Sequence, residues 1–248
     1  MDMYKFTDEM STSIVKRIME GYKSYLNERI QKKKELIISS AYAWVQANHI
    51  DHYVAKETKN LGINYIPSKA GYSWGYLQFQ NINDKVLFLI KNGAAIERNA
   101  AKKRTNQENN YLEQMARKIN GKINFSNHAT VNEQLDLFRL YDQIQAVPDS
   151  IEKEIEELED QIDRFYIVTY TLDEQKMISD ISLCLPHPET FQLHRVDSLT
   201  RFIDTIDIEF TDEDFAGIRD DKEINTQVTI GDYGIVVEDE EEASDTEQ

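Results

Sequence analysis

The sequence predicts an α+β fold, made of several helices, two β-hairpins and a disordered acidic C-terminal tail. Apolar residues recur at helical spacing in some stretches, whereas two other stretches alternate as strands do. Glycine and proline are scarce, with 9 and 4 among 248 residues, which disfavours a loop-rich or all-β repeat protein. Acidic residues crowd the C-terminal end, which is typical of unfolded sequence.

The N-terminal stretch predicts two helices. Ser11 or Thr12 can cap the first, whose apolar stripe is formed by Ile14, Ile18, Tyr22, Leu26 and Ile30. This helix reaches a basic cluster at 32–34, which the negative end of the helix dipole favours. A second helix is expected over 35–59, with Gly62 just beyond its end as a stop signal. Its inward residues are expected to be Ile37, Ala41, Trp44 and Val45.

The first hairpin follows these helices. Residues 72–80 are rich in aromatics and alternate, 81–84 supply turn residues, and 85–91 form an almost continuous apolar run. This pattern predicts a hairpin whose second strand is buried on both faces. Helices are then expected around 111–119 and 135–144, the second of them stopped by Pro148.

The C-terminal part begins with an acidic helix from Ser150. A second hairpin is expected from 165–172 and 177–185, and it ends at Pro186, because proline cannot donate to a sheet ladder. Cys184 lies in this hairpin and is interpreted as a small packed residue rather than a catalytic thiol. A short helix at 198–206, a small β element at 227–237 and disorder from about 238 complete the expectations.

Charge separates along the chain. Residues 1–148 hold 21 Lys and Arg against 15 Asp and Glu, whereas 149–248 hold 7 against 30. We therefore distinguish a mildly basic region at 1–148, an acidic helix and hairpin at 149–210 packed on it as one domain, and an acidic tail at 211–248. No secretory signal is evident, and the longest apolar stretch, 86–90, is too short to cross a bilayer, so a cytoplasmic protein without membrane contact is expected.

Enzymatic signatures are weak. His49 and His52 can share a helix face, but a metal site needs further ligands. The order of helices and hairpins invites comparison with metal-dependent nucleases, in which an Asp precedes a Glu-x-Lys strand. Asp84 and Lys91 fit, but Leu89 stands at the acidic position and cannot bind a metal. Neither a Gly-x-Ser-x-Gly motif nor a phosphate-binding glycine loop is present. We therefore expect a non-enzymatic protein with no catalytic residue, metal or cofactor.

Nucleic acid is the first expected partner. Cations neutralise phosphates and aromatic rings stack on unpaired bases. The basic region supplies both, and its candidate residues are Lys32, Lys33, Lys34, Lys69, Trp74, Tyr76, Arg98, Lys102, Lys103 and Arg104. A net of +6 is modest, so ordinary solvated lysines and packed aromatics are the competing interpretation. The acidic half is a solubilising tail, a competitor that folds back on the basic half, or a surface for a basic partner.

One stretch resembles a known group of proteins. Residues 164–172 and 181–186, followed by 193–197, are similar to the C-terminal hairpin of proteins of unknown function from Gram-positive bacteria and their phages. The resemblance implies a bacterial or phage source and assigns no residue roles. The sequence thus favours a regulatory or interaction protein that binds nucleic acid through its basic half. The alternatives are an inhibitor or counter-defence factor that docks on a basic host or phage protein, and an enzyme of unfamiliar layout.

Overall fold

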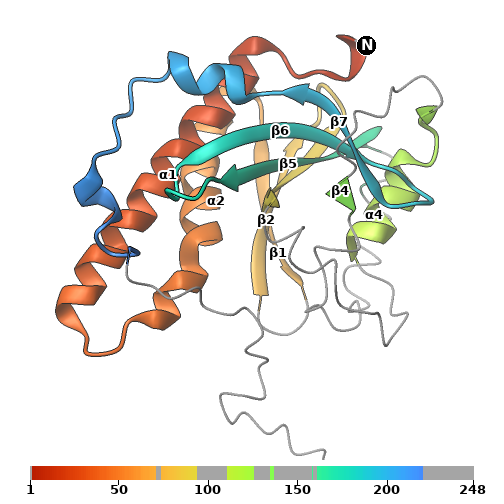
Figure 1. Cartoon of the computed structure of the whole chain (residues 1–248). Coiled ribbons are helices and arrows are strands. Elements are labelled where there is room, and N and C mark those ends of the chain that lie inside the picture. The colour runs from red at the N-terminus through yellow and green to blue at the C-terminus, as the bar shows by residue number, and fades with distance from the viewer. Residues whose placement is uncertain are drawn as a thin grey trace, which may run out of the picture.

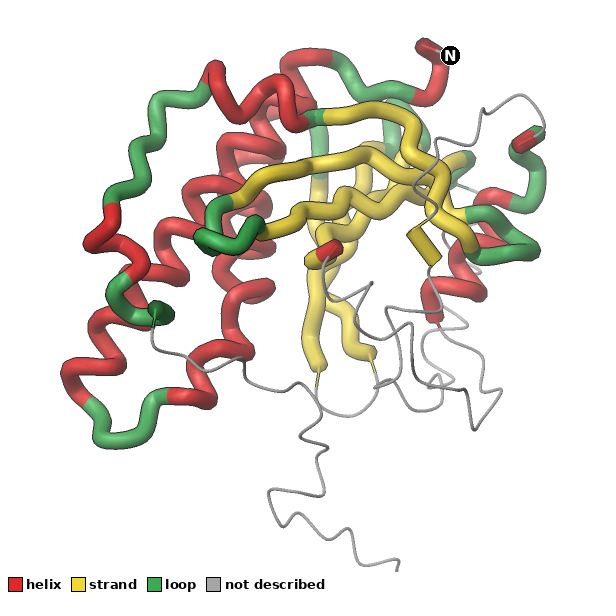
Figure 2. The backbone as a smooth tube through the Cα atoms, in the orientation of Figure 1, coloured by secondary structure: helices red, strands yellow, loops and turns green. Residues whose placement is uncertain are grey.

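A seven-stranded mixed β-sheet forms the centre of the protein, with helices on both faces (Figure 1, Figure 2). The computed structural model describes residues 2–70, 74–93, 111–125, 135–136, 158 and 161–219. One face is covered by α1 (Asp8–Glu35) and α2 (Gln46–Glu57), and the other by α4 (Tyr111–Asn120). The sequence prediction of an α+β fold is confirmed.

The strands follow the order β1-β2-β3-β5-β6-β7-β4. Their bounds are β1 Asn64–Ala70, β2 Trp74–Asn81, β3 Val86–Asn92, β4 Leu135–Asp136, β5 Arg164–Leu172, β6 Ile178–Pro186 and β7 Gln192–Ser198. The first three strands form an antiparallel meander, and so do β5, β6 and β7. The parallel pairing of β3 with β5 joins the two meanders, so strands from 1–148 and 149–210 lie in one sheet.

Helix α1 begins earlier than predicted. Thr7 is its N-cap, and its hydroxyl accepts a hydrogen bond from the backbone N–H of Met10 at 3.2 Å. Ser11, one of the two caps expected from the sequence, lies fully buried inside the helix. The predicted apolar stripe is largely confirmed, since Ile14, Ile18, Tyr22 and Leu26 are all buried.

The second predicted helix is wrong at its start. Leu36 has φ −119° and ψ 141°, so the chain leaves α1 in an extended conformation. A short 3₁₀ segment at Ser40–Val45 follows, in which no residue is buried, and α2 begins only at Gln46. Ile37, expected to point inward, is fully exposed. The apolar spacing at 37–45 resembled a helix face, but Val45 packs only partly against the core and Ile37 does not reach it.

Helices α1 and α2 approach closely at Gly21. A Cβ atom on this glycine would lie 2.6 Å from the Cα of Ile50 and 2.9 Å from the carbonyl oxygen of His49. Only glycine therefore permits this spacing. The close contact holds α2 between α1 and the sheet, where it delivers Asp51 to β2.

Both predicted hairpins are confirmed, as β2 with β3 and β5 with β6. The first five residues of β3 are buried because the strand lies at the sheet centre between two core layers. Ile90 and Phe88 pack toward α1 and α2, whereas Leu87 and Leu89 pack toward α4. Cys184 is buried in the second layer, as predicted.

Several other elements differ from expectation. Strands β1 and β7 were not predicted, and residues 135–136 form a strand beside β7 where a helix was expected to begin. A helix at Tyr111–Asn120 is confirmed, and the short helix near 198–206 is a 3₁₀ segment at Thr200–Thr205. The acidic helix from Ser150 lies almost wholly outside the described residues, as does the β element at 227–237. The predicted tail is described at 211–219, where Phe215 and Ile218 are buried in the core. Among the helices that are described, none combines the length and apolarity needed to cross a membrane.

Candidate nucleic-acid interface and a buried acid–base pair

The sheet opens between β2 and β3. Their ladder comprises three residue pairs, from Phe79 with Phe88 to Asn81 with Val86. Continuing this register would place Leu77 opposite Ile90. Instead, the backbone N–H of Leu77 donates to Oδ2 of Asp51 on α2, at 3.2 Å. A buried backbone donor must be satisfied, so this carboxylate occupies the place of a sheet partner.

Lys91 lies near the end of β3 and is half-buried. Its Nζ is 5.0 Å from the centroid of the Tyr76 ring, and its charge interacts with that of Asp51. Burial raises the pKa of Asp51 to about 6, against the opposing effects of Lys91 and of the Leu77 N–H. Burial also lowers the pKa of Lys91, and Asp51 counteracts part of that shift. Both groups are therefore held closer to neutrality than in water.

A tyrosine completes the polar centre. The hydroxyl of Tyr170, on β5, accepts a hydrogen bond from Nε2 of Gln46 at 3.2 Å and contacts the side chain of Asn92. Burial raises the pKa of Tyr170, and the nearby Asp51 raises it further. These contacts tie the start of α2 to the carboxyl ends of the two parallel strands, β3 and β5.

The pair of Asp51 and Lys91 has the elements of acid–base chemistry, a carboxyl that titrates near neutral pH and an amine with a lowered pKa. Two surface cavities of about 350 and 440 Å³ are lined by other residues, near Met177 and near His187. In the described parts of the chain, no three His, Cys, Asp or Glu side chains gather closely enough to hold a metal ion. The arrangement therefore fits a buried pair that fixes α2 on the sheet.

The comparison with metal-dependent nucleases, which Leu89 disfavours, gains no support from the placement of Asp84 and Lys91. Asp84 lies in the turn before β3, where its carboxylate binds Nδ2 of Asn81 at 2.6 Å and its carbonyl oxygen accepts from Arg164. Lys91 lies at the other end of the same strand. The carboxylate beside the lysine is that of Asp51, forty positions earlier in the chain, and nothing in the local pattern could reveal it.

The two histidines of α2 face different partners. Nδ1 of His49 lies 3.0 Å from the hydroxyl of Ser24 on α1, and burial lowers the pKa of this imidazole. His52 is exposed and packs edge-on against Tyr53. Asp51 points to the sheet instead. The helix spacing that suggested a shared ligand face therefore brings no metal site together here.

The predicted basic residues gather toward one end of the molecule. Gln46 contacts Tyr170, so the start of α2 lies at the carboxyl ends of β3 and β5. The end of α1 precedes it in the chain, and the turn end of the β1–β2 hairpin lies at the carboxyl end of β3 because β2 is antiparallel to β3 (Figure 1). We call this the basic end, defined by Lys32, Lys33, Lys34 and Lys69.

The four lysines differ in availability. Lys32 pairs with Glu35 at 2.8 Å and with Glu28 at 3.9 Å. Nζ of Lys33 lies 3.4 Å from the carbonyl oxygen of Ala216. Lys34 and Lys69 are exposed, and neither makes an ion pair with another residue that the structure describes. Within the described part of the chain, no ion pair therefore has to break before these two ammonium groups meet a phosphate.

Of the aromatic residues on the first hairpin and the strand before it, the candidate Tyr76 is buried, whereas Tyr65 is exposed. Tyr76 is buried, stacked on Tyr111 with centroids 4.8 Å apart and covered by Lys91, so its ring is not a surface for stacking. Tyr65 on the edge strand β1 is 47% exposed. Because strand residues alternate, Tyr65 and Lys69 point to the same face of β1. Edge exposure was invisible in the sequence, because β1 itself was not predicted.

The remaining candidates are less completely placed. Trp74 begins β2 at the basic end, where its backbone pairs with Ala70. Arg98, Lys102, Lys103 and Arg104 lie outside the described residues. The flanking positions are described, however, and the chain leaves β3 at Gly93, toward the basic end.

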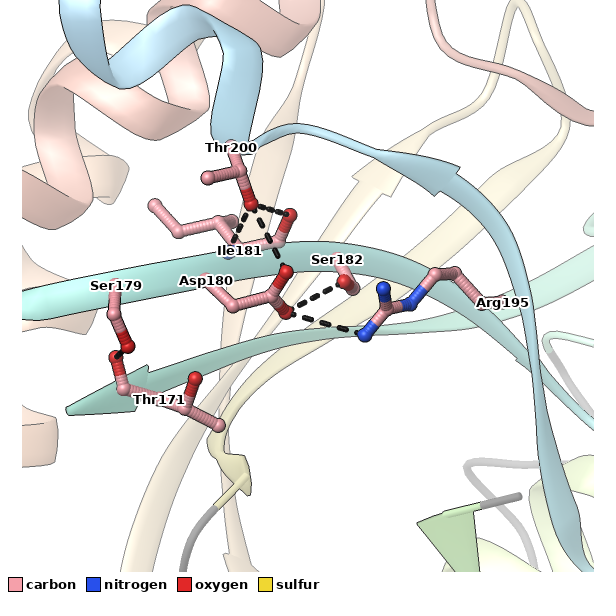
Figure 3. Close-up of polar contacts among 7 residues, drawn as sticks. All are labelled: Thr171, Ser179, Asp180, Ile181, Ser182, Arg195 and Thr200. Carbon is pink, nitrogen blue, oxygen red and sulfur yellow. Dashed lines mark hydrogen bonds and ion pairs between the residues drawn. The ribbon is translucent and has the colours of Figure 1, made fainter. Parts of the chain in front are cut away.

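A second polar cluster, on β6 and β7, is satisfied internally (Figure 3). Oδ2 of Asp180 accepts from the hydroxyl of Ser182 at 2.7 Å and lies 3.5 Å from Arg195, and its Oδ1 lies 3.0 Å from the hydroxyl of Thr200. Thr200 accepts from the N–H of Ile181 at 3.0 Å. The cluster lies beside the irregularity in the β6–β7 register after Leu183 and clamps the following 3₁₀ segment to β6. Its role is structural.

Three comparisons with known proteins gave one match. A family model described as a family of unknown function (DUF5986) matches residues 4–248. No curated protein and no solved structure matches the chain. The match extends far beyond the C-terminal hairpin to which the resemblance in the sequence was confined, and it assigns no chemistry to any residue.

Proposed function

We propose that this chain, which belongs to the family of unknown function DUF5986, binds nucleic acid through its basic end and acts as a non-enzymatic regulatory protein of bacterial or phage origin. The observation that carries the proposal is the availability of Lys34, in the last turn of α1, and of Lys69, beside the β1–β2 turn. Both are exposed and lack an ion-pair partner among the described residues.

The side chains of this surface favour single-stranded over duplex nucleic acid. Lysines act as point charges toward phosphates, and the exposed ring of Tyr65 offers a stacking face for an unpaired base. Lys69 follows Tyr65 by four residues on the same face of β1, a separation of about 13 Å. That spacing suits a backbone running along the edge strand, with a base turned onto the ring. No base-reading contact is proposed, so affinity depends mainly on charge.

The buried pair supports this interface from below. Asp51 and Gln46 anchor α2 to β2 and β5, and α1, which packs on α2, carries three of the four lysines in its last turn. Because α2 is fixed, the lysines at the end of α1 hold their place relative to Lys69. The acid–base pair thus serves position rather than catalysis in this proposal.

The first test is fluorescence anisotropy with single-stranded and duplex probes over a salt series, using the full-length protein and a chain ending at Asn225. The shorter chain keeps every described residue and loses eight carboxylates and no cation. We expect tighter binding by the shorter chain, preference for the single strand, and affinity that falls steeply with salt. With about three phosphate contacts, the slope of log K against log salt should be about −2 for the single strand.

Failure of both proteins to bind either probe at low salt would contradict the proposal. A search for a basic protein partner would then be the next step, since the acidic half would remain without a role. Binding without salt dependence would also contradict it, because the lysines would not carry the affinity.

A further inference from the structure

An apolar corner adjoins the basic cluster. Leu36, Ile37 and Ile38 follow the last turn of α1 and are 43%, 105% and 79% exposed. Three consecutive large aliphatic side chains in water are unfavourable, and such a patch typically marks a contact surface. With Lys32, Lys33 and Lys34 they form what we call the α1 corner, in which cations precede apolar residues along the chain.

We infer that the α1 corner is the docking site of this chain's own C-terminal segment, residues 235–242. That segment has the complementary order, because Ile235, Val236 and Val237 precede the acidic run at 238–242. Aligned antiparallel to the corner, its apolar residues meet Ile37 and Ile38 while its carboxylates meet the lysines. The same alignment in parallel would place carboxylates against isoleucines.

The last described residues lie against α1, so the tail that follows them begins close to the α1 corner. A Cβ on Gly217 would lie 2.7 Å from the backbone nitrogen of Ile30, so residue 217 touches the end of α1. Lys33 contacts Ala216, and Lys23 pairs with Asp214 at 3.7 Å. The last described residue, Arg219, therefore leaves from the side of α1 that leads to the corner.

Length permits the contact with ease. Residues 220–237 can span about 60 Å when extended, which exceeds the length of α1 itself. Because the tail is tethered in the same molecule, it faces the corner at an effective concentration of about millimolar, so even weak apolar and ionic contacts suffice. Charge supports the choice of occupant, since residues 226–248 hold eight carboxylates and no cation.

The consequence for activity rests on the proposed function. If the basic end binds nucleic acid, the docked carboxylates compete with phosphates for Lys33 and Lys34. The tail then acts as an intramolecular competitor whose hold weakens as salt rises. The docking contact itself exists without nucleic acid, so it can be tested separately.

The test is disulfide formation in the full chain between Ile38→Cys and Ile235→Cys, under mild oxidation at low protein concentration. The native thiol does not interfere, since Cys184 is fully buried and burial raises its pKa to about 12. The control pair is Glu189→Cys with Ile235→Cys, because Glu189 is exposed in the turn after β6, at the end of the sheet opposite the α1 corner. We expect the first pair to close at least tenfold faster than the control.

Charge reversal in the α1 corner provides the second part of the test. Adding Lys33→Glu and Lys34→Glu to the first pair should slow closure several-fold, and high salt should do the same. Equal rates for both cysteine pairs, or no effect of the added glutamates, would overturn the inference. Cross-links that form only between molecules would overturn it too and would assign the corner to a second copy. These outcomes are independent of whether the protein binds nucleic acid.

Discussion

Replacing Asn120 with leucine is expected to lower the free energy of unfolding by about 3 kcal/mol or more, because three buried backbone groups lose their partner. Asn120 ends α4 and is fully buried. Its Nδ2 donates to the carbonyl oxygens of Phe165 and Pro186, each at 2.9 Å, and its Oδ1 accepts from the N–H of Phe165 at 2.8 Å. One amide thus joins a helix to two strands, and leucine fills its volume without replacing any bond.

The matched control is Asn48→Leu, which makes the same change at an exposed position of α2. Urea unfolding monitored by circular dichroism should show a much lower midpoint for the Asn120 variant, with the control within about 0.5 kcal/mol of the parent. Similar midpoints for the two variants would mean that the amide of Asn120 does not hold α4 on the sheet.

Stability is expected to fall as pH rises from about 4 to 6, through the titration of Asp51. The native carboxyl has a pKa raised to about 6 from 3.8, so the folded state holds its proton more tightly than the unfolded state. Below pH 3.8 both states are protonated and the group contributes nothing. Above pH 6 the native carboxylate must be ionised while buried, at a cost of about 3 kcal/mol relative to the unfolded state.

Asp51→Asn removes this titration while keeping an oxygen that can accept from the N–H of Leu77. We expect the difference in unfolding free energy between pH 4.5 and 7 to shrink in this variant. Asp163→Asn, on an exposed carboxylate paired with Lys85, should leave the difference unchanged. Identical pH profiles for the parent and the Asp51 variant, or a carboxyl carbon chemical shift that titrates near 4 in the native protein, would refute the assignment.

The sequence predicted the elements whose signals are local. Strand alternation located both hairpins, and the uninterrupted apolar run of β3 indicated burial on both faces. The sequence prediction failed where tertiary contacts determine the local structure. The spacing at 37–45 suggested a helix, but no residue of this stretch is fully buried, and α1 ends at Glu35 with Leu36 in an extended conformation. β1 contains Pro67, which weakens a strand signal yet is tolerated on an edge.

The candidate site residues also divide into those that local sequence signals locate and those whose placement depends on tertiary contacts. The lysines at 32–34 follow directly from the sequence, because an amphipathic helix places its terminal charges in solvent. Tyr76 was misplaced, since its burial depends on Tyr111 packing against the far face of the sheet. The pairing of Asp51 with Lys91 depends on the sheet opening after Phe79, which is a property of two strands and a helix together.

The central claim, that the basic end is the nucleic-acid interface, is tested most directly by charge reversal in the chain ending at Asn225. Lys34→Glu combined with Lys69→Glu is compared with Lys16→Glu combined with Lys122→Glu, which makes the same change at exposed lysines outside the basic end. We predict that the first pair weakens binding of a single-stranded probe by at least tenfold at low salt and makes the salt slope shallower by about 1.4, while the second pair changes affinity less than threefold. Equal losses for the two pairs would show that only net charge matters and would contradict a defined interface.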